Sequence, residues 1–135
     1  MKKKQSSKGG AQVSRSKMPD VVTADPELLE RGLRVVERQV ELGQVLVDLL
    51  AVDAAGRPVL VYLARNWSEE QAVPLRAMDG DYQFRRYRQV LRKVFPGQGL
   101  NWELAPRSVV AAWDFDRQTL ERFLTMNGLE ADLVE

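Results

Sequence analysis

One carboxylate stands in the middle of an apolar run. Asp48 lies inside QVLVDLLAV, residues 44–52, and Tyr62 lies inside the next apolar run, VLVYLA, residues 59–64. Burying an unpaired carboxylate is costly, so Asp48 predicts a bound metal, a hydrogen-bonding partner or an exposed face. If the two runs are adjacent strands, Tyr62 and Ala64 share one face of the second strand. The pattern therefore indicates either half of a metal site or a structural carboxylate.

The residue types that the chain lacks narrow its chemistry. It has no cysteine, which excludes disulfides, thiolate metal sites and thiol nucleophiles. It has no histidine either, which excludes Ser-His triads and removes the commonest general base and metal ligand. The segment PGQGLN, residues 96–101, lacks the features of a phosphate-binding loop. The remaining route to catalysis is Mg²⁺ or Mn²⁺ bound by carboxylate oxygens from two or more elements.

Three strands joined by short links are expected to position Asp48 and Tyr62. Valine-rich runs separated by Gly43 and by the turn DAAGRP favour an antiparallel meander. A short helix over 23–32 is expected before it, with Asp25 as cap, Pro26 in the first turn and Gly32 at the end. The predicted strands are 33–41, 44–52 and 59–64.

The second half of the chain predicts further helices and strands. A loop containing Trp67 and Pro74 is expected to lead into a long helix over 79–95, because Phe84, Tyr87 and Leu91 recur at helical spacing. The later elements are a strand over 107–115, a helix over 117–126 capped by Asp116, and a strand over 129–135. The fold class is therefore α/β: a mixed sheet, made of the meander plus further strands, flanked by helices.

Charge divides the 135 residues into two parts. Residues 1–19 carry six basic and no acidic side chains, whereas the remainder holds 14 basic and 19 acidic ones. We expect residues 1–20 to be a disordered basic tail, which either binds phosphate-rich partners or only solubilises the chain, and 21–135 to form one domain. No apolar run approaches the roughly 20 residues of a membrane-spanning helix, so a cytoplasmic protein without membrane contact is expected.

The meander also resembles a known family. The segment LLERGLRVVERQVELGQVLVDLLAVDAAGRPVLVYLAR is similar to the nuclease domain of the PD-(D/E)XK superfamily, and most similar to NucS-type endonucleases. That domain has a GLRV-ERQ strand, an IDLLAVD strand, a glycine turn and a V-ELK strand. QFRRYR and GLEADLVE extend the likeness, which covers about residues 25–135 and implies a restriction-endonuclease-like fold.

The resemblance implies a site but also shows where this chain departs from it. In the family, an Asp on the second strand and a Glu on the third bind a divalent metal, and a Lys two residues later positions the attacking water. Asp48 matches the Asp, whereas Tyr62 and Ala64 stand at the Glu and Lys positions. Gln83 matches the glutamine of the following helix. Asp48 would bind Mg²⁺ or Mn²⁺ only if other acids, such as Glu37, Glu69 or Glu70, replaced the lost ligands; otherwise no cofactor is expected.

Three functions follow as hypotheses. The first is a catalytically degenerate nuclease domain that binds nucleic acid. The second is a protein-interaction or structural subunit, with a protein partner or a second copy of the chain, for which Trp67 and Trp102 would suit an interface. The third is a metal-dependent endonuclease with migrated ligands. The expected nucleic-acid-binding residues are Lys2, Lys3, Lys4, Lys8, Arg65, Arg85, Arg86, Arg88 and Arg92.

Overall fold

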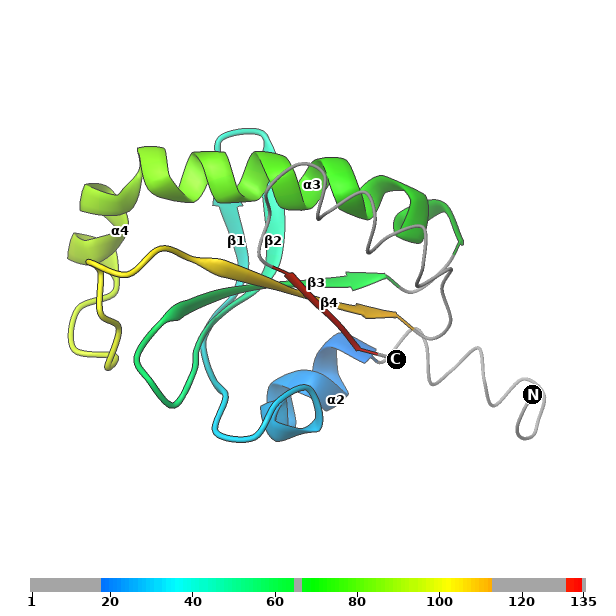
Figure 1. Ribbon diagram of the computed structural model, residues 1–135, viewed down its shortest axis with the longest axis horizontal. Coiled ribbons are helices and arrows are strands. Elements are labelled where there is room, and N and C mark those ends of the chain that lie inside the picture. The colour runs from blue at the N-terminus through cyan, green and yellow to red at the C-terminus, as the bar shows by residue number, and fades with distance from the viewer. Residues whose placement is uncertain (1–17, 65–66, 113–130, 135) are drawn as a thin grey trace.

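The strands that the structure describes form one five-stranded mixed sheet. The computed structural model describes residues 18–64, 67–112 and 131–134. In it the strands lie in sequence order, with β1, β2 and β3 antiparallel and with β4 and β5 added in parallel (Figure 1). The mixed sheet predicted from the sequence is thereby confirmed. The strands are β1 Arg34–Leu42, β2 Val45–Val52, β3 Pro58–Ala64, β4 Arg107–Ala112 and β5 Ala131–Val134.

Tight turns explain why the first three strands form a meander. Gly43 joins β1 to β2 with a φ of 64°, a left-handed conformation that glycine adopts without steric cost. Between β2 and β3, the Asp53 carboxylate accepts hydrogen bonds from the backbone N–H groups of Ala55 and Arg57, each at 2.9 Å. Such side-chain bonds stabilise a turn locally. The predicted strands agree with the observed ones to within one residue at each end.

The first helical segment differs from its prediction. Helix α2 spans Met18–Ala24 and a separate 3₁₀ turn, η1, spans Pro26–Leu28, in place of one helix over 23–32. Asp25 has a φ of −141° and makes no side-chain capping bond. The break has a steric cause, because a proline disfavours the helical conformation of the residue before it. The expected boundary between tail and domain, at residue 20, falls inside α2.

Helix α3 corrects the expected loop around Trp67 and Pro74. It spans Trp67–Arg86 and contains Pro74 in its interior. A proline removes one intrahelical hydrogen bond, but α3 buries Val73 and Ala77 against the sheet, and this tertiary packing outweighs the local preference. The single helix expected over 79–95 is divided at Tyr87, after which α4 spans Arg88–Val94.

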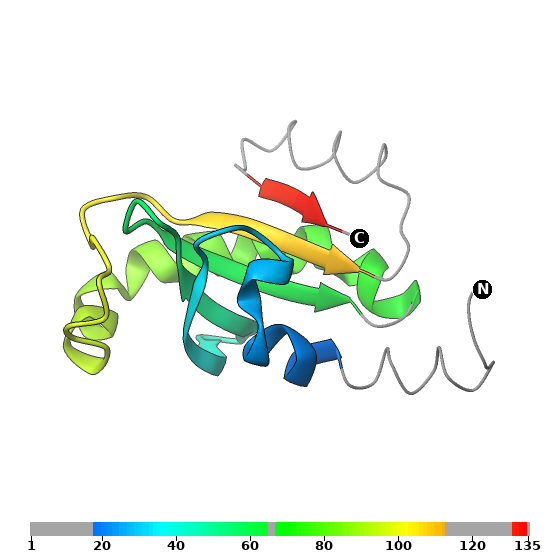
Figure 2. The same ribbon diagram turned by 90° about the horizontal axis from the view of Figure 1, so that it is seen from below.

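The sheet is covered on both faces, which gives two hydrophobic clusters. α3 and α4 lie on one face of the sheet and α2 lies on the other (Figure 2). The cluster under α3 and α4 contains Tyr62, Phe84 and Trp102, and the second cluster contains Val22 of α2 with Leu33 and Leu49. β3 is buried along its whole length. A strand covered on both sides reads as a continuous apolar run, as VLVYLA does.

A buried ion network links three parts of the chain: the segment before β1, the β2–β3 turn and the start of β4. Arg107 on β4 is 8% exposed and pairs with Glu30 and with Asp53, whose Oδ2 lies 3.2 Å from Nη2. A buried arginine requires such partners, since an unpaired charge would be strongly destabilising. The network ties the β2–β3 turn to the start of β4.

Several expected segments lie outside the described residues. They are residues 1–17 of the tail, Arg65, residues 113–115 of the predicted strand 107–115, and the predicted helix 117–126. β4 and β5 agree with the expected strands where the structure describes them. Of the helices that the structure describes, none has the length and apolar character needed to cross a membrane.

Candidate functional site

Asp48 lies where β2 and β3 cease to pair. The ladder between the two strands runs from Val52 and Pro58 to Leu49 and Val61, and Asp48 and Tyr62 are the next residues in register. Beyond this point the backbone N–H of Leu63 donates a hydrogen bond to Asp48 Oδ2 at 2.7 Å. The carboxylate thus supplies the acceptor that a β-ladder would otherwise provide. The hydrogen-bonding partner that the sequence predicted for Asp48 is therefore present, and it is the backbone N–H of Leu63.

On the β1 side, the residue across from Asp48 has an unusual backbone conformation. On β1, Arg38 pairs with Leu49 and Val40 pairs with Val47, so Gln39 is the residue across from Asp48. Gln39 has a φ of 52°. A residue other than glycine in this region carries strain of about 1–3 kcal/mol, and such strain persists only where the surrounding structure enforces it. At Asp48, β2 therefore has a left-handed residue of β1 on one side and the end of its ladder with β3 on the other.

Arg76 is the second charged group of the site, and it was not among the residues predicted from the sequence. From α3 its Nη2 donates to Asp48 Oδ2 at 3.2 Å and to the backbone carbonyl of Leu46 at 2.8 Å. Its guanidinium carbon lies 5.4 Å from the centroid of the Tyr62 ring. The side chains of Arg76 and Asp48 are only 25% and 19% exposed, so water screens this ion pair weakly. The position of Arg76 near Asp48 depends on the continuation of α3 through Pro74, where the sequence predicted a loop.

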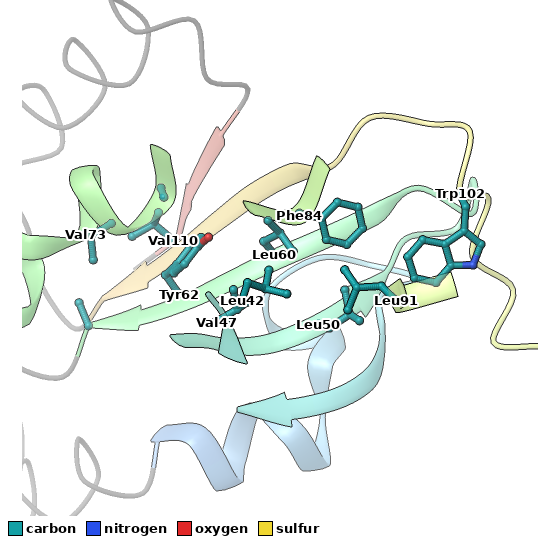
Figure 3. Close-up of a cluster of buried hydrophobic side chains, with 12 residues drawn as sticks. Leu42, Val47, Leu50, Leu60, Tyr62, Val73, Phe84, Leu91, Trp102 and Val110 are labelled. Atoms are coloured by element: carbon teal, nitrogen blue, oxygen red, sulfur yellow. The ribbon is translucent and has the colours of Figure 1, made fainter. Parts of the chain in front are cut away.

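Tyr62 fills the space between the sheet and α3 (Figure 3). The side chain is fully buried, and its hydroxyl has no hydrogen-bond partner among the described residues. A Cβ atom on Gly80 would lie 1.9 Å from the Tyr62 hydroxyl, so only glycine fits at this position of α3. Burial raises the pKa of Tyr62 well above its usual range, although Arg76 acts in the opposite direction. Tyr62 is therefore a neutral phenol and a poor metal ligand.

The other positions of the predicted motif lie in different surroundings. Ala64 is fully buried in the cluster that contains Tyr62. Gln83 is half-buried on α3, and its side-chain amide lies against Gly43 in the β1–β2 turn. Its Oε1 is buried and accepts no hydrogen bond from any described residue. The structure therefore joins Tyr62 and Ala64 in one cluster and places Gln83 beside a turn.

The described residues around Asp48 do not form a site for a divalent metal. Mg²⁺ and Mn²⁺ favour several oxygen ligands, and carboxylates are the main ones. The expected replacement Glu37 is exposed and accepts a hydrogen bond from the backbone N–H of Arg38 at 2.9 Å, while Glu69 and Glu70 lie in the first turn of α3. Within the described ranges, no three Asp, Glu, His or Cys side chains are placed to hold a metal ion together. Asp48 instead pairs with a cation of the protein itself.

The arginines expected to bind nucleic acid are not gathered at Asp48. Arg85 pairs with Asp81 one turn earlier in α3, and Arg92 of α4 lies 3.7 Å from Glu103. Arg86 is exposed, with its guanidinium 5.8 Å from the ring centroid of Tyr87. Arg88 is half-buried. None of these four arginines hydrogen-bonds or ion-pairs with Asp48 in the part of the chain that the structure describes.

Of the two tryptophans proposed for an interface, Trp102 lies in the turn segment before β4 but its side chain is buried. Trp102 is 8% exposed and stacks on Phe84, with ring centroids 5.9 Å apart and planes inclined by 10°. Figure 3 shows Trp102, Phe84 and Leu91 at one end of the core and Tyr62 and Val73 toward the other. Trp102 is therefore a core residue. Trp67 is the first residue of α3.

Comparison with known proteins identifies the family. Residues 14–101, more than half of the chain, match the family model of the endonuclease NucS C-terminal domain. This chain belongs to the NucS C-terminal domain family. Endonuclease NucS 2 of Halobacterium salinarum is 38% identical to it over 50 residues, which make up 37% of this chain and 20% of that protein. The resemblance predicted from the strands around Asp48 is thereby confirmed.

Solved NucS-like structures share the fold. A repair endonuclease from Pyrococcus abyssi superposes with a TM-score of 0.54 at 20% identity, over 100% of this chain and 50% of that one. The EndoMS-dsDNA2 complex gives 0.51 at 20% identity, covering 100% of this chain and 48% of that chain. EndoMS in its apo form superposes with a TM-score of 0.54 at 24% identity, over 90% of this chain and 46% of that chain. The chain thus spans about half of these structures or less, and the likeness establishes the nuclease-domain fold.

Proposed function

We propose that this NucS C-terminal domain binds nucleic acid without hydrolysing it. The observation that carries the proposal is the Asp48–Arg76 ion pair: the carboxylate that matches the metal ligand of the resemblance is neutralised by a cation of the same chain. Tyr62 and Ala64, at the Glu and Lys positions, supply neither a carboxylate nor an amine. Among the residues that the structure describes around Asp48, we therefore find no second carboxylate and no amine placed to activate a water.

The physical requirement of hydrolysis supports this conclusion. A metal-dependent nuclease must hold the ion firmly and lower the pKa of a bound water. Asp48 Oδ2 already accepts hydrogen bonds from Leu63 and Arg76, so a metal ion bound at this oxygen would compete with the Arg76 guanidinium. A neutral phenol at Tyr62 adds a weak ligand only. We therefore place the function in binding, which needs shape and charge but no metal.

Nucleic acid is the partner that the fold and the charges favour. One of the structural neighbours is an EndoMS complex with double-stranded DNA, and we extend that partner class to this chain. Arg86 and Lys93 are exposed on α3 and α4, and no acidic side chain pairs with either in the described structure. With Arg65 and the tail lysines they would contact phosphates, each contact releasing counterions. The tail before α2, residues 1–17, then acts as an auxiliary arm of the domain.

The binding half of the proposal is tested by fluorescence anisotropy with labelled duplex DNA, single-stranded DNA and RNA. We expect binding at low salt in the presence of EDTA, with the logarithm of the association constant falling linearly as the logarithm of salt concentration rises. Deleting residues 2–17 should weaken binding and reduce that slope. Absence of binding to all three probes at low salt would overturn the proposal.

The alternative of a protein-interaction subunit is favoured by a different observation. Several large apolar side chains on α3 and α4 are exposed, with Leu75 at 68% and Tyr82 at 59%, and Val90 and Val94 are also exposed. Exposed apolar groups on neighbouring helices can mark an interface. Sedimentation of the chain alone, compared with a Leu75→Glu/Tyr82→Glu variant, tests self-association. A dimer that the variant abolishes, together with no nucleic-acid binding, would establish this function instead.

A further inference from the structure

Asp48 and Arg76 form a compact cluster of charged and polar groups between β2 and α3. Asp48 supplies one carboxylate, and the guanidinium of Arg76 lies 3.2 Å from it. The same Nη2 reaches the carbonyl oxygen of Leu46 at 2.8 Å, and the guanidinium lies above the ring of Tyr62. Arg76 is thus surrounded by an anion, a carbonyl dipole and an aromatic face, which are all groups that attract a cation.

Tyr62 and Gly80 complete this arrangement. The ring of Tyr62 occupies the core beneath α3, and its hydroxyl reaches the point where a side chain at position 80 would begin. Because that hydroxyl is buried without a partner in the described structure, it costs stability, and the packing of the ring under Arg76 must offset the cost. The tyrosine, the glycine and the arginine therefore depend on one another.

From this geometry we propose that Arg76 is a resident cation that takes the place of the divalent metal in this domain. It neutralises Asp48 and holds the irregular end of β2 in position without any ion. The inference goes beyond nucleic-acid binding, since it concerns what occupies the site and holds whether or not DNA is bound. Its main consequence is that restoring the motif residues alone does not restore a metal site, because Arg76 competes with the metal for the carboxylates.

The decisive experiment measures Mn²⁺ binding by electron paramagnetic resonance, in which the signal of free Mn²⁺ falls as the ion binds. The full chain is compared with Tyr62→Glu/Ala64→Lys and with the triple variant that adds Arg76→Gln. We expect no binding by the native chain, little by the double variant, and an affinity for the triple variant about 10- to 100-fold above the double. Arg85→Gln added to the double variant is the matched control, and it should leave the Mn²⁺ affinity of the double variant unchanged.

Two results would overturn the inference. One is a double variant that binds Mn²⁺ as tightly as the triple variant; the other is a folded triple variant, judged by circular dichroism, that gains no affinity. If the triple variant does not fold, a cycle of the milder changes Asp48→Asn and Arg76→Gln replaces it. In urea unfolding their effects should be clearly less than additive, and Asp48→Asn with Arg85→Gln should be additive. Additive effects of Asp48→Asn and Arg76→Gln would also overturn the inference.

Discussion

The Arg76 guanidinium and the Asp48 carboxylate form an ion pair between α3 and β2, with Nη2 3.2 Å from Oδ2. The same Oδ2 accepts the Leu63 N–H at 2.7 Å. One carboxylate atom therefore joins a helix to two strands at the point where their ladder ends. This relationship gives Asp48 a structural role between α3, β2 and β3.

Replacing Asp48 should destabilise the domain. Asp48→Ala removes the acceptor of the Leu63 N–H and leaves Arg76 partly buried without its anion, so the free energy of unfolding should fall by about 1–3 kcal/mol. Urea unfolding measures the change. Glu41→Ala, at an exposed acid of β1, is the control and should stay within about 0.5 kcal/mol of the native chain. A similarly small effect of Asp48→Ala would contradict the structural role of Asp48.

Replacing Gly80 by alanine should destabilise the domain, whereas the same change at an ordinary helical glycine is stabilising. Inside a helix Gly→Ala usually stabilises by about 1 kcal/mol. Here the new Cβ would lie 1.9 Å from the Tyr62 hydroxyl, so Gly80→Ala should destabilise by about 1–3 kcal/mol. Tyr62→Phe removes the clashing oxygen and should recover part of the loss. If Gly80→Ala raises the melting temperature, the packing described for Tyr62 is wrong.

The Asp53 carboxylate should make stability depend on pH in the acid range. Burial alone would raise the pKa of Asp53, but hydrogen bonds from the Arg57 backbone N–H and the Arg107 guanidinium outweigh it and lower the pKa. A lowered folded-state pKa means that the unfolded chain binds protons first. The stabilisation is therefore complete above the ordinary value of about 3.9 and is lost as pH falls below it, through the folded-state pKa.

Urea unfolding of the native chain and Asp53→Asn over this range checks the prediction. The native chain should be the more stable at neutral pH, and its advantage should shrink on acidification. Asp25→Asn, at an exposed aspartate beside η1, should give a difference that does not vary in this way. A constant advantage over Asp53→Asn would show that the Arg107 network does not depend on the Asp53 charge.

The helix arginines should contribute unequally to nucleic-acid binding. Arg85 is held by Asp81 at 3.0 Å, whereas Arg86 is exposed and has no acidic partner in the described structure. Arg86→Ala should weaken binding and lower the slope of affinity against salt by about 1, as expected for one lost phosphate contact. Arg85→Ala is the neighbouring control and should change the slope less. Equal effects, or a larger effect at Arg85, would contradict this interface.

Local signals made the meander predictable. Valine-rich runs separated by Gly43 and the DAAGRP turn specify short antiparallel strands without help from distant residues. The position of Asp48 beside Tyr62 followed from that register. The family resemblance followed from the same strands, and the matching family model confirms it.

Contacts between distant elements were not predictable. Pro74 is a local helix breaker, and only the burial of Val73 and Ala77 against the sheet keeps α3 continuous around it. Arg76 was missed for the same reason, because its place above Asp48 depends on that continuity. The fit of Tyr62 against Gly80 joins side chains of different elements, and no spacing rule in a single sequence reports such a contact.

The central claim is binding without hydrolysis, and one measurement tests it most directly. Labelled single-stranded, duplex and branched DNA are incubated with the full chain in Mn²⁺ or in EDTA, and each sample is analysed on native and denaturing gels, with Asp48→Ala in parallel. We predict equal amounts of complex in Mn²⁺ and EDTA, and intact DNA in every lane. Cleavage products that form only with Mn²⁺ and disappear with Asp48→Ala would contradict the claim and establish an active nuclease.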